Sequence, residues 1–201
     1  IERIAVKKPD LILKIAEEQP SVIVKMAQNQ PQIIEKLLRK DPKFLEKMAK
    51  AVAEGAAEAG AEVDIARVDE VDVDKVPMYD GYAFGSPTHC GTMSTKMNEF
   101  FNQRLIKYWG KLRYKVAVAF TSSGGLGGGN EMTLWSLLSA IINYGMMTFG
   151  VPDYVARGVT LHYGAVAIGT PNKDSLKACK LLGRLLVEHA TIIKKGRSVK
   201  Q

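Results

Sequence analysis

Phe120-Thr-Ser-Ser-Gly-Gly-Leu-Gly-Gly-Gly-Asn-Glu131 decides the fold, since it joins an apolar run at 115–120 to an apolar helical pattern at 130–144. Five of the six residues from Gly124 to Gly129 are glycine. Ordering a glycine costs about 0.5–1 kcal/mol more than ordering an alanine in regular structure, which disfavours a purely structural role. The stretch therefore predicts a strand, a loop that offers backbone groups to a ligand, and a helix.

The segments around this stretch repeat the alternation of strand and helix. Strands are expected near 61–68, at 79–85 and at 146–151, and helices from about 48 to Gly60, at 92–106 and at 173–193. This alternation is typical of a parallel sheet with helices on both faces. The fold class predicted is α/β, a three-layer sandwich.

A repeat precedes this domain. Prolines recur every eleven residues, and apolar pairs follow each at the same offsets, which places them on one helical face. The prolines are Pro9, Pro20, Pro31 and Pro42. We interpret residues 1–46 as a helical arm for packing or oligomerisation, 47–195 as the main domain and 196–201 as a basic tail. The alternative for the arm is a solvated charged extension.

Composition excludes several classes of function. The net charge of +7 is spread along the chain without interleaved aromatics, so no nucleic-acid binding is expected. The two cysteines lie in no metal-ligand spacing, so no metal is expected. No apolar run reaches the roughly 20 residues that span a bilayer, so no membrane partner is expected. The charged residues of 1–10 are unlike a signal segment, and a cytoplasmic location is expected.

Two further segments follow predicted strands, where ligands bind in open α/β sheets. In Gly85-Ser-Pro-Thr-His-Cys-Gly-Thr-Met-Ser94, hydroxyls and glycines could meet a ligand, or Thr92 or Ser94 could simply cap a helix. In Thr160-Leu-His-Tyr-Gly-Ala165, an aromatic side chain could cover a ring, or the histidine could be structural. No catalytic acid, base or nucleophile is identified.

Four motifs carry a resemblance to a known family. They are Gly85-Ser-Pro-Thr-x-x-Gly91, Phe120-Thr-Ser-Ser-Gly124 with Gly128-Gly-Asn-Glu131, Asn143-Tyr-Gly145, and His162-Tyr-Gly-Ala165. From about 48 to 195 the chain resembles the flavodoxin-like NAD(P)H:quinone oxidoreductases of the tryptophan-repressor-binding-protein type and related flavodoxins. The resemblance implies a flavodoxin-like fold and FMN as cofactor.

The resemblance also implies the site residues. In the family a first loop lies along the flavin ring, which corresponds here to Ser86, Pro87, Thr88, His89, Cys90 and Gly91. A glycine-rich loop gives the ring backbone hydrogen-bond donors, which corresponds to Ser122, Ser123, Gly124, Gly125, Leu126, Gly127 and Gly128. The residue before a Tyr-Gly pair also approaches the cofactor, and here it is Asn143. Trp109 resembles the family's tryptophan near the nicotinamide or quinone, and we assign His162 and Tyr163 to the substrate side. Family members are commonly tetramers whose sites neighbouring chains complete, so a homo-oligomer, dimer or tetramer, is expected.

One departure concerns the start of the domain. The family begins with an apolar strand and a Ser, Thr and Gly loop for the flavin phosphate, whereas Lys36-Leu-Leu-Arg-Lys-Asp-Pro42 stands here. Arg39 and Lys40 could offer charge without the same nest of N–H groups. Three explanations stay open: a rearranged or truncated gene, a strand hidden in residues 1–7, or a strand lent by another chain.

The leading hypothesis is an FMN-dependent oxidoreductase that passes electrons from NAD(P)H to a quinone. A flavodoxin-like electron carrier is an intermediate case. The alternative from another class is an interaction and assembly module that has lost its cofactor, which the missing phosphate loop favours.

Overall fold

The computed structural model describes residues 42–151, 154–157 and 159–198. The chain divides into two units, 1–43 and 44–201, and only the second is described throughout most of its length. The first three units of the proline repeat, the segment 1–7, Arg39 and Lys40 all lie outside the described residues, so the arm and its boundaries stay predictions. No helix among the described residues is long and apolar enough to cross a membrane.

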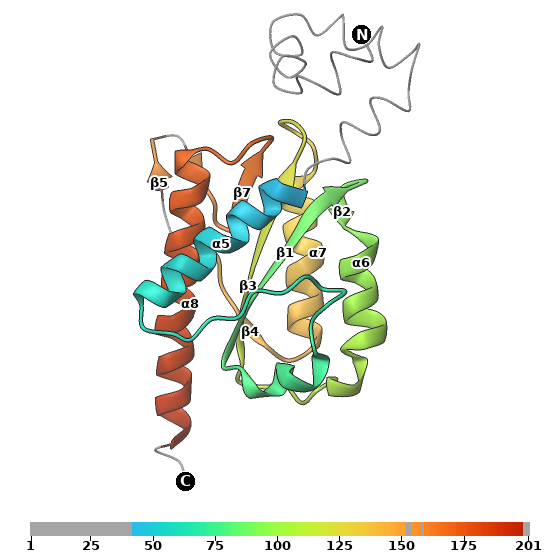
Figure 1. Cartoon of the computed structure of the whole chain (residues 1–201), viewed down its shortest axis with the longest axis vertical. Coiled ribbons are helices and arrows are strands. Elements are labelled where there is room, and N and C mark those ends of the chain that lie inside the picture. The colour runs from blue at the N-terminus through green and yellow to red at the C-terminus, as the bar shows by residue number, and fades with distance from the viewer. Residues whose placement is uncertain (1–41, 152–153, 158, 199–201) are drawn as a thin grey trace, which may run out of the picture. The chain divides into compact units, whose positions relative to one another are not determined.

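A parallel sheet forms the centre of the domain (Figure 1). Strand β3 (Val116–Ser123) lies between β1 (Gly81–His89) on one side and two short strands on the other. Of these, β4 (Met147–Thr148) pairs with the start of β3, and β7 (Ala165–Ile168) pairs with its end. The short β2 (Thr92–Met93) folds back antiparallel on β1. Strands β5 (Tyr154–Ala156) and β6 (Val159–Thr160) form a separate pair.

Helices cover both faces of this sheet, as Figure 1 shows. All eight residues of β3 are buried, and their alternation divides the core in two. Ala117 and Ala119 face α6 (Thr95–Glu99), its π-helical continuation (Phe100–Arg104) and α7 (Asn130–Asn143). Val116 and Val118 face α5 (Pro42–Glu58) and α8 (Lys173–Ser198). The predicted three-layer α/β sandwich is therefore confirmed.

Helices α5 and α8 touch through their backbones where they cross. A Cβ atom at Gly183 would overlap the carbonyl of Val52, and one at Gly55 would overlap the carbonyl of Lys180. The first residue of α5 is Pro42, which suits a position whose N–H has no helical partner. The fourth unit of the repeat thus begins a continuous helix of the main domain, whose Met48 is fully buried.

The predicted strand at 61–68 is wrong. Residues 61–67 form neither helix nor strand and pair with no strand of the described structure, and Ile65 is 53% exposed. On the edge of β1 that faces away from β3, only the short β2 is paired, and it pairs only with Thr88 and His89. No described strand therefore lies along the rest of that edge, where a strand at 61–68 would have to pair. Arg104 instead donates to the carbonyls of Val68 and Val71, the latter at 2.6 Å.

Two further predictions of elements need correction. The helix expected at 92–106 starts only at Thr95, because 92–93 form β2, and it ends as a π-helical turn followed by a 3-10 turn at Ile106–Tyr108. The strand expected at 146–151 contains only Met147 and Thr148, since β7 takes the rest of that edge of β3. A 3-10 helix at Val73–Met78 precedes β1.

Candidate functional site

The two predicted ring loops meet at the carboxyl ends of β1 and β3. In the parallel register Pro87 lies opposite Ser122, so both strands reach the same edge of the sheet together. Hydroxyls connect the ends: the Thr88 Oγ1 atom lies 3.2 Å from Thr121 Oγ1 and 2.9 Å from Thr133 Oγ1 on α7. Because Thr121 and Thr133 are fully buried, this network fixes the loops against the helix.

The glycine-rich loop presents backbone donors. Gly128 N–H donates to Gly125 O at 3.1 Å, which closes a turn. Within the part of the chain that the structure describes, the N–H groups of Gly125, Leu126 and Gly127 donate to no protein acceptor. The space beside Gly125 and Gly127 is open, and Leu126 is 90% exposed. Three neighbouring donors are thus free for a ligand at the amino end of α7, where the helix dipole favours negative charge.

The first loop combines structural and exposed residues. The Ser86 hydroxyl is buried, accepts from Ser94 N–H at 2.8 Å and donates to Pro87 O at 2.9 Å. Ser94 also caps α6, as one alternative predicted. His89 and Cys90 are exposed at the hairpin turn, where Cys90 has a φ of 50°. Ser86 therefore shapes the loop through its hydroxyl, while the turn beyond it faces solvent.

Tyr163 brings the His162-Tyr-Gly-Ala165 motif beside α7. His162 and Tyr163 form the turn before β7, and the Tyr163 ring centroid lies 5.1 Å from that of Trp135. Both rings are about half exposed. Trp135 was not singled out from the sequence, although a tryptophan amid an otherwise apolar helix is the signal that could have found it.

Comparison with known proteins agrees with this geometry. Residues 44–138 match the family described as Flavodoxin. A protein named flavodoxin from Aquifex aeolicus is 48% identical over 152 residues, which is 75% of this chain and 82% of that protein. A protein named NAD(P)H dehydrogenase (quinone) from Archaeoglobus fulgidus is 35% identical over 174 residues, covering 71% of this chain and 89% of that protein.

The chain belongs to the flavodoxin family.

Solved structures show the same fold. An archaeal flavodoxin aligns with a TM-score of 0.60 at 20% identity, covering 76% of this chain and 94% of that one. A WrbA-like flavodoxin from Agrobacterium tumefaciens aligns with a TM-score of 0.56 at 23% identity, covering 78% of this chain and 93% of that one. The expected likeness to flavodoxins and to the quinone oxidoreductases related to them is confirmed.

Membership of the flavodoxin family makes FMN the cofactor of this chain. The ring half of FMN fits the residues present, because the free N–H groups of the glycine-rich loop lie at the edge of the sheet where the Thr88 loop meets them. The phosphate half has no Ser, Thr and Gly loop in the sequence ahead of α5. That stretch, 36–41, lies outside the described residues.

Two predicted site residues lie elsewhere in this flavodoxin-like chain. Trp109 precedes β3 and packs against Tyr144, with ring centroids 5.0 Å apart, at the amino end of the strands. Asn143 is the last residue of α7, and at 1.5 Å per residue its 14-residue helix puts it about 20 Å from the glycine-rich loop. Within one chain, therefore, neither residue lies with the ring loops. The resemblance assigns both residues to the flavin or substrate side of the site, so their placement within one chain differs from that expectation.

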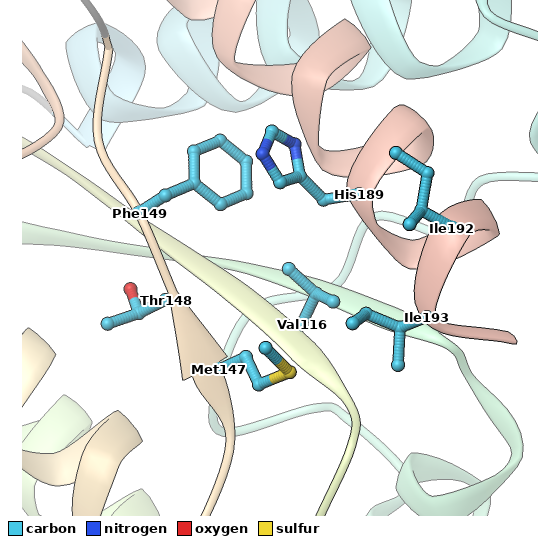
Figure 2. A pocket seen from close by; sticks show the side chains of 7 residues that line it. All are labelled: Val116, Met147, Thr148, Phe149, His189, Ile192 and Ile193. Carbon is cyan, nitrogen blue, oxygen red and sulfur yellow. The ribbon is translucent and has the colours of Figure 1, made fainter. Parts of the chain in front are cut away.

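A small apolar hollow lies apart from the ring loops, at the start of β3 (Figure 2). Its volume is about 100 Å³, below the roughly 300 Å³ or more of most ligand pockets. The His189 ring stacks on Phe149 there, with centroids 4.1 Å apart, and its Nδ1 atom lies 2.8 Å from Leu185 O. The hollow is therefore not the flavin site.

Two observations concern the remaining titratable groups of the described residues. The described residues hold no group of three or more His, Cys, Asp or Glu that could bind a metal. Cys179 on α8 is buried, and burial raises the pKa of its thiol to about 12. It is a core residue, as its helical position indicates.

Proposed function

We propose that this protein is an FMN-dependent oxidoreductase that passes electrons from NAD(P)H to a quinone. The observation that carries the proposal is the set of free N–H groups at Gly125, Leu126 and Gly127, held against the Thr88 loop at the carboxyl end of the sheet. The name of the Archaeoglobus fulgidus relative, NAD(P)H dehydrogenase (quinone), supports the choice of reaction.

The residues of the chain would bind and orient the flavin. Pro87, Thr88 and Gly91 would line one side of the ring, and the glycine-rich loop would donate hydrogen bonds to its polar edge. The amino end of α7 would favour negative charge there. FMN, when bound, supplies the hydride and electron-transfer chemistry, so no side chain is required as acid or base.

The substrate side of the site would include a neighbouring copy of the chain. His162 and Tyr163 lie beside α7 of the same chain, but Trp109 and Asn143 lie at the other end of the sheet. A role for these two residues near the nicotinamide or quinone therefore requires a homo-oligomer. This arrangement agrees with the resemblance to oxidoreductases whose sites are shared between chains.

A flavodoxin-like electron carrier is the second candidate, and the 48% identity to the Aquifex aeolicus flavodoxin favours it. The two candidates differ in one reaction. An oxidoreductase consumes NADH or NADPH steadily when benzoquinone is present, whereas a carrier does not. A cofactor-free module would neither bind flavin nor consume the nucleotide.

The test is a titration of the purified full chain with FMN and, separately, with riboflavin, followed by turnover assays. We expect a retained flavin absorption band and similar dissociation constants for the two flavins, because both ring loops are present and the sequence directly ahead of α5 offers no Ser, Thr and Gly loop for the phosphate. Much tighter binding of FMN would assign a phosphate site to other residues, with Arg39 and Lys40 as the first to mutate. Folded protein that binds neither flavin would rule out the proposed function in favour of the cofactor-free module.

A further inference from the structure

A hollow lined by charged side chains lies at the amino ends of β1 and β3, at the end of the sheet opposite the ring loops. Its volume is about 240 Å³. Asp80 and Lys115 directly precede the two strands, which meet there through a hydrogen bond of 3.2 Å from Val116 N–H to Asp80 O. The last turns of α8 extend past these strand ends, as Figure 1 shows, and form the other wall. The lining residues are Asp80, Tyr114, Lys115, Ala190, Lys194, Arg197 and Ser198.

Positive charge dominates this lining. It contains three cationic side chains and one carboxylate, so its net charge is +2 when these groups are ionised. The Asp80 carboxylate lies 2.7 Å from Lys194 Nζ and 3.6 Å from Lys115 Nζ. One carboxylate therefore compensates two ammonium groups only in part, and it leaves the Arg197 guanidinium without a negative partner among the described residues.

Two guanidinium groups meet the ring of Tyr114 at the rim of the hollow. Arg197 Cζ lies 5.0 Å from the ring centroid, and Arg113 Cζ lies 5.8 Å from it. Like Arg197, Arg113 forms no ion pair with another described residue. Cations that gather around one ring repel each other, and an anion bound beside them offsets that repulsion. The helix dipole favours cations in the last turn of α8, but it does not account for Arg113 or Lys115, which precede β3.

The turn before β3 holds Tyr114 against its backbone preference. Its φ is 67°, in the left-handed region that bulky side chains rarely adopt. The side chain is about half exposed, so burial in the core does not account for this conformation. Strained positions of this kind persist where surrounding contacts hold them, and they are found at ligand sites. Here the conformation keeps the ring against Arg197 of α8 and so fixes one wall of the hollow.

We propose that this hollow binds the phosphate group of a small phosphate monoester. Such a group carries about two negative charges near neutral pH, which matches the net charge of the lining. Its oxygens accept hydrogen bonds from ammonium and guanidinium groups, and the planar donors of arginine suit phosphate in particular. The volume is below the roughly 300 Å³ or more of most ligand pockets, so a small ligand fits best.

The hollow is separate from the proposed flavin site. The ring loops follow the carboxyl ends of the same two strands, and the eight residues of β3 span about 25 Å at roughly 3.3 Å per residue. A flavin held by the ring loops therefore does not compete with an anion in the hollow.

The test is a calorimetric titration of the full chain with glycerol 3-phosphate in about 0.1 M sodium chloride, which screens exposed charges more than roughly 10 Å apart. We expect one saturable site, weakened about tenfold in Arg197→Gln and about threefold in Arg113→Gln, which lies at the rim. Lys195→Gln is the matched control, because Lys195 lies on the same end of α8 but not in the lining. All three side chains are exposed, and circular dichroism would check that each variant folds. Absence of a saturable site, or an equal loss in Lys195→Gln, overturns the proposal.

Two further measurements locate the bound anion. Amide NMR signals should shift at Asp80, at Lys115 and in the last turn of α8, and shifts confined to the glycine-rich loop would overturn the proposal. Vesicles of phosphatidylcholine with phosphatidic acid present the same group on a lipid, and sedimentation with these vesicles without binding of glycerol 3-phosphate would rule out a soluble ligand. None of these measurements needs flavin, so failure to bind FMN would contradict the proposed function alone.

Discussion

A Cβ atom placed at Gly129 would lie 2.9 Å from the Cα atom of Gly91. The glycine-rich loop and the β1–β2 turn therefore touch backbone to backbone, at the point where α7 begins. Contact of this kind fixes the separation of the loops more tightly than side chains can. The width of the proposed flavin site depends on it.

Gly129→Ala should weaken FMN binding by about tenfold or more, because a contact below normal van der Waals distance forces the two loops apart, and a shift of 1.4 kcal/mol is tenfold in affinity. Gly60→Ala is the matched control, since Gly60 also has a positive φ, 89°, but has open space around its Cβ position. Both variants share the backbone strain, and only Gly129→Ala should change the dissociation constant in a flavin titration. Equal affinities in the two variants would show that the contact does not shape the site.

Thr133→Val should destabilise the protein by about 1–3 kcal/mol, because Thr133 is fully buried and its hydroxyl lies within hydrogen-bond distance of Thr88 Oγ1 and Gly129 O. Valine has nearly the same shape as threonine, so the loss of stability measures the contribution of the hydroxyl group. Urea unfolding measures it, with Thr191→Val on the exposed face of α8 as the control. A loss no larger than that of the control would mean that the network contributes nothing.

Gly183→Ala should lower the free energy of unfolding by about 1–3 kcal/mol, since the added methyl group overlaps the Val52 carbonyl where α5 and α8 cross. Gly196 lies on the same helix with open space around it. Gly196→Ala should therefore raise stability by up to about 1 kcal/mol through helix propensity. Opposite signs in thermal or urea unfolding would confirm the close crossing, and two stabilised variants would contradict it.

One cysteine of the two should react quickly in the folded protein. Cys90 is exposed, whereas Cys179 is buried and burial raises the pKa of its thiol to about 12. Iodoacetamide should label Cys90 first, and mass spectrometry of peptides would identify it. Because Cys90 adjoins the proposed ring site, FMN should slow its labelling. Labelling of Cys90 at an unchanged rate with saturating FMN would place the flavin elsewhere.

Stability should fall below about pH 4 partly through Asp80. A hydrogen bond from Lys194 Nζ at 2.7 Å and the nearby Lys115 ammonium lower the pKa of the Asp80 carboxyl. A carboxyl whose pKa is lower in the folded state stabilises the fold above its unfolded pKa and loses that effect as the pH falls through the folded value. Asp80→Asn should therefore reduce the fall in the free energy of unfolding at acid pH. The reduction should be less than about 1 kcal/mol, because the ion pair is partly exposed. Glu62→Gln is the control.

The sequence predicted the elements that depend on their own residues. The short, continuous apolar run of β3, which ends at a glycine-rich loop, indicates a buried strand, and the apolar pattern of α7 indicates a helix that begins just after the last glycine of Gly124–Gly129. Because both ring loops follow strands of one parallel sheet, their meeting at its carboxyl edge also followed from the sequence.

Elements that depend on a neighbour were not predictable in this way. The alternating residues at 61–68 suit a strand but have no described strand beside them, and the apolar segment after Met146 shares its edge of β3 with β7. Strand pairing is satisfied between segments distant in sequence, so local pattern cannot decide it.

The sequence by itself determined the family and, through it, the cofactor, and it singled out the two loops proposed to face the flavin ring, because these reside in short motifs whose chemistry is local. Only the tertiary structure decided that Trp109 and Asn143 lie at the opposite end of the sheet, and that α7 keeps an apolar face outward. A helix of 14 residues carries its last residue about 20 Å from its first, so motifs adjacent in the chain are separated by the length of the elements between them.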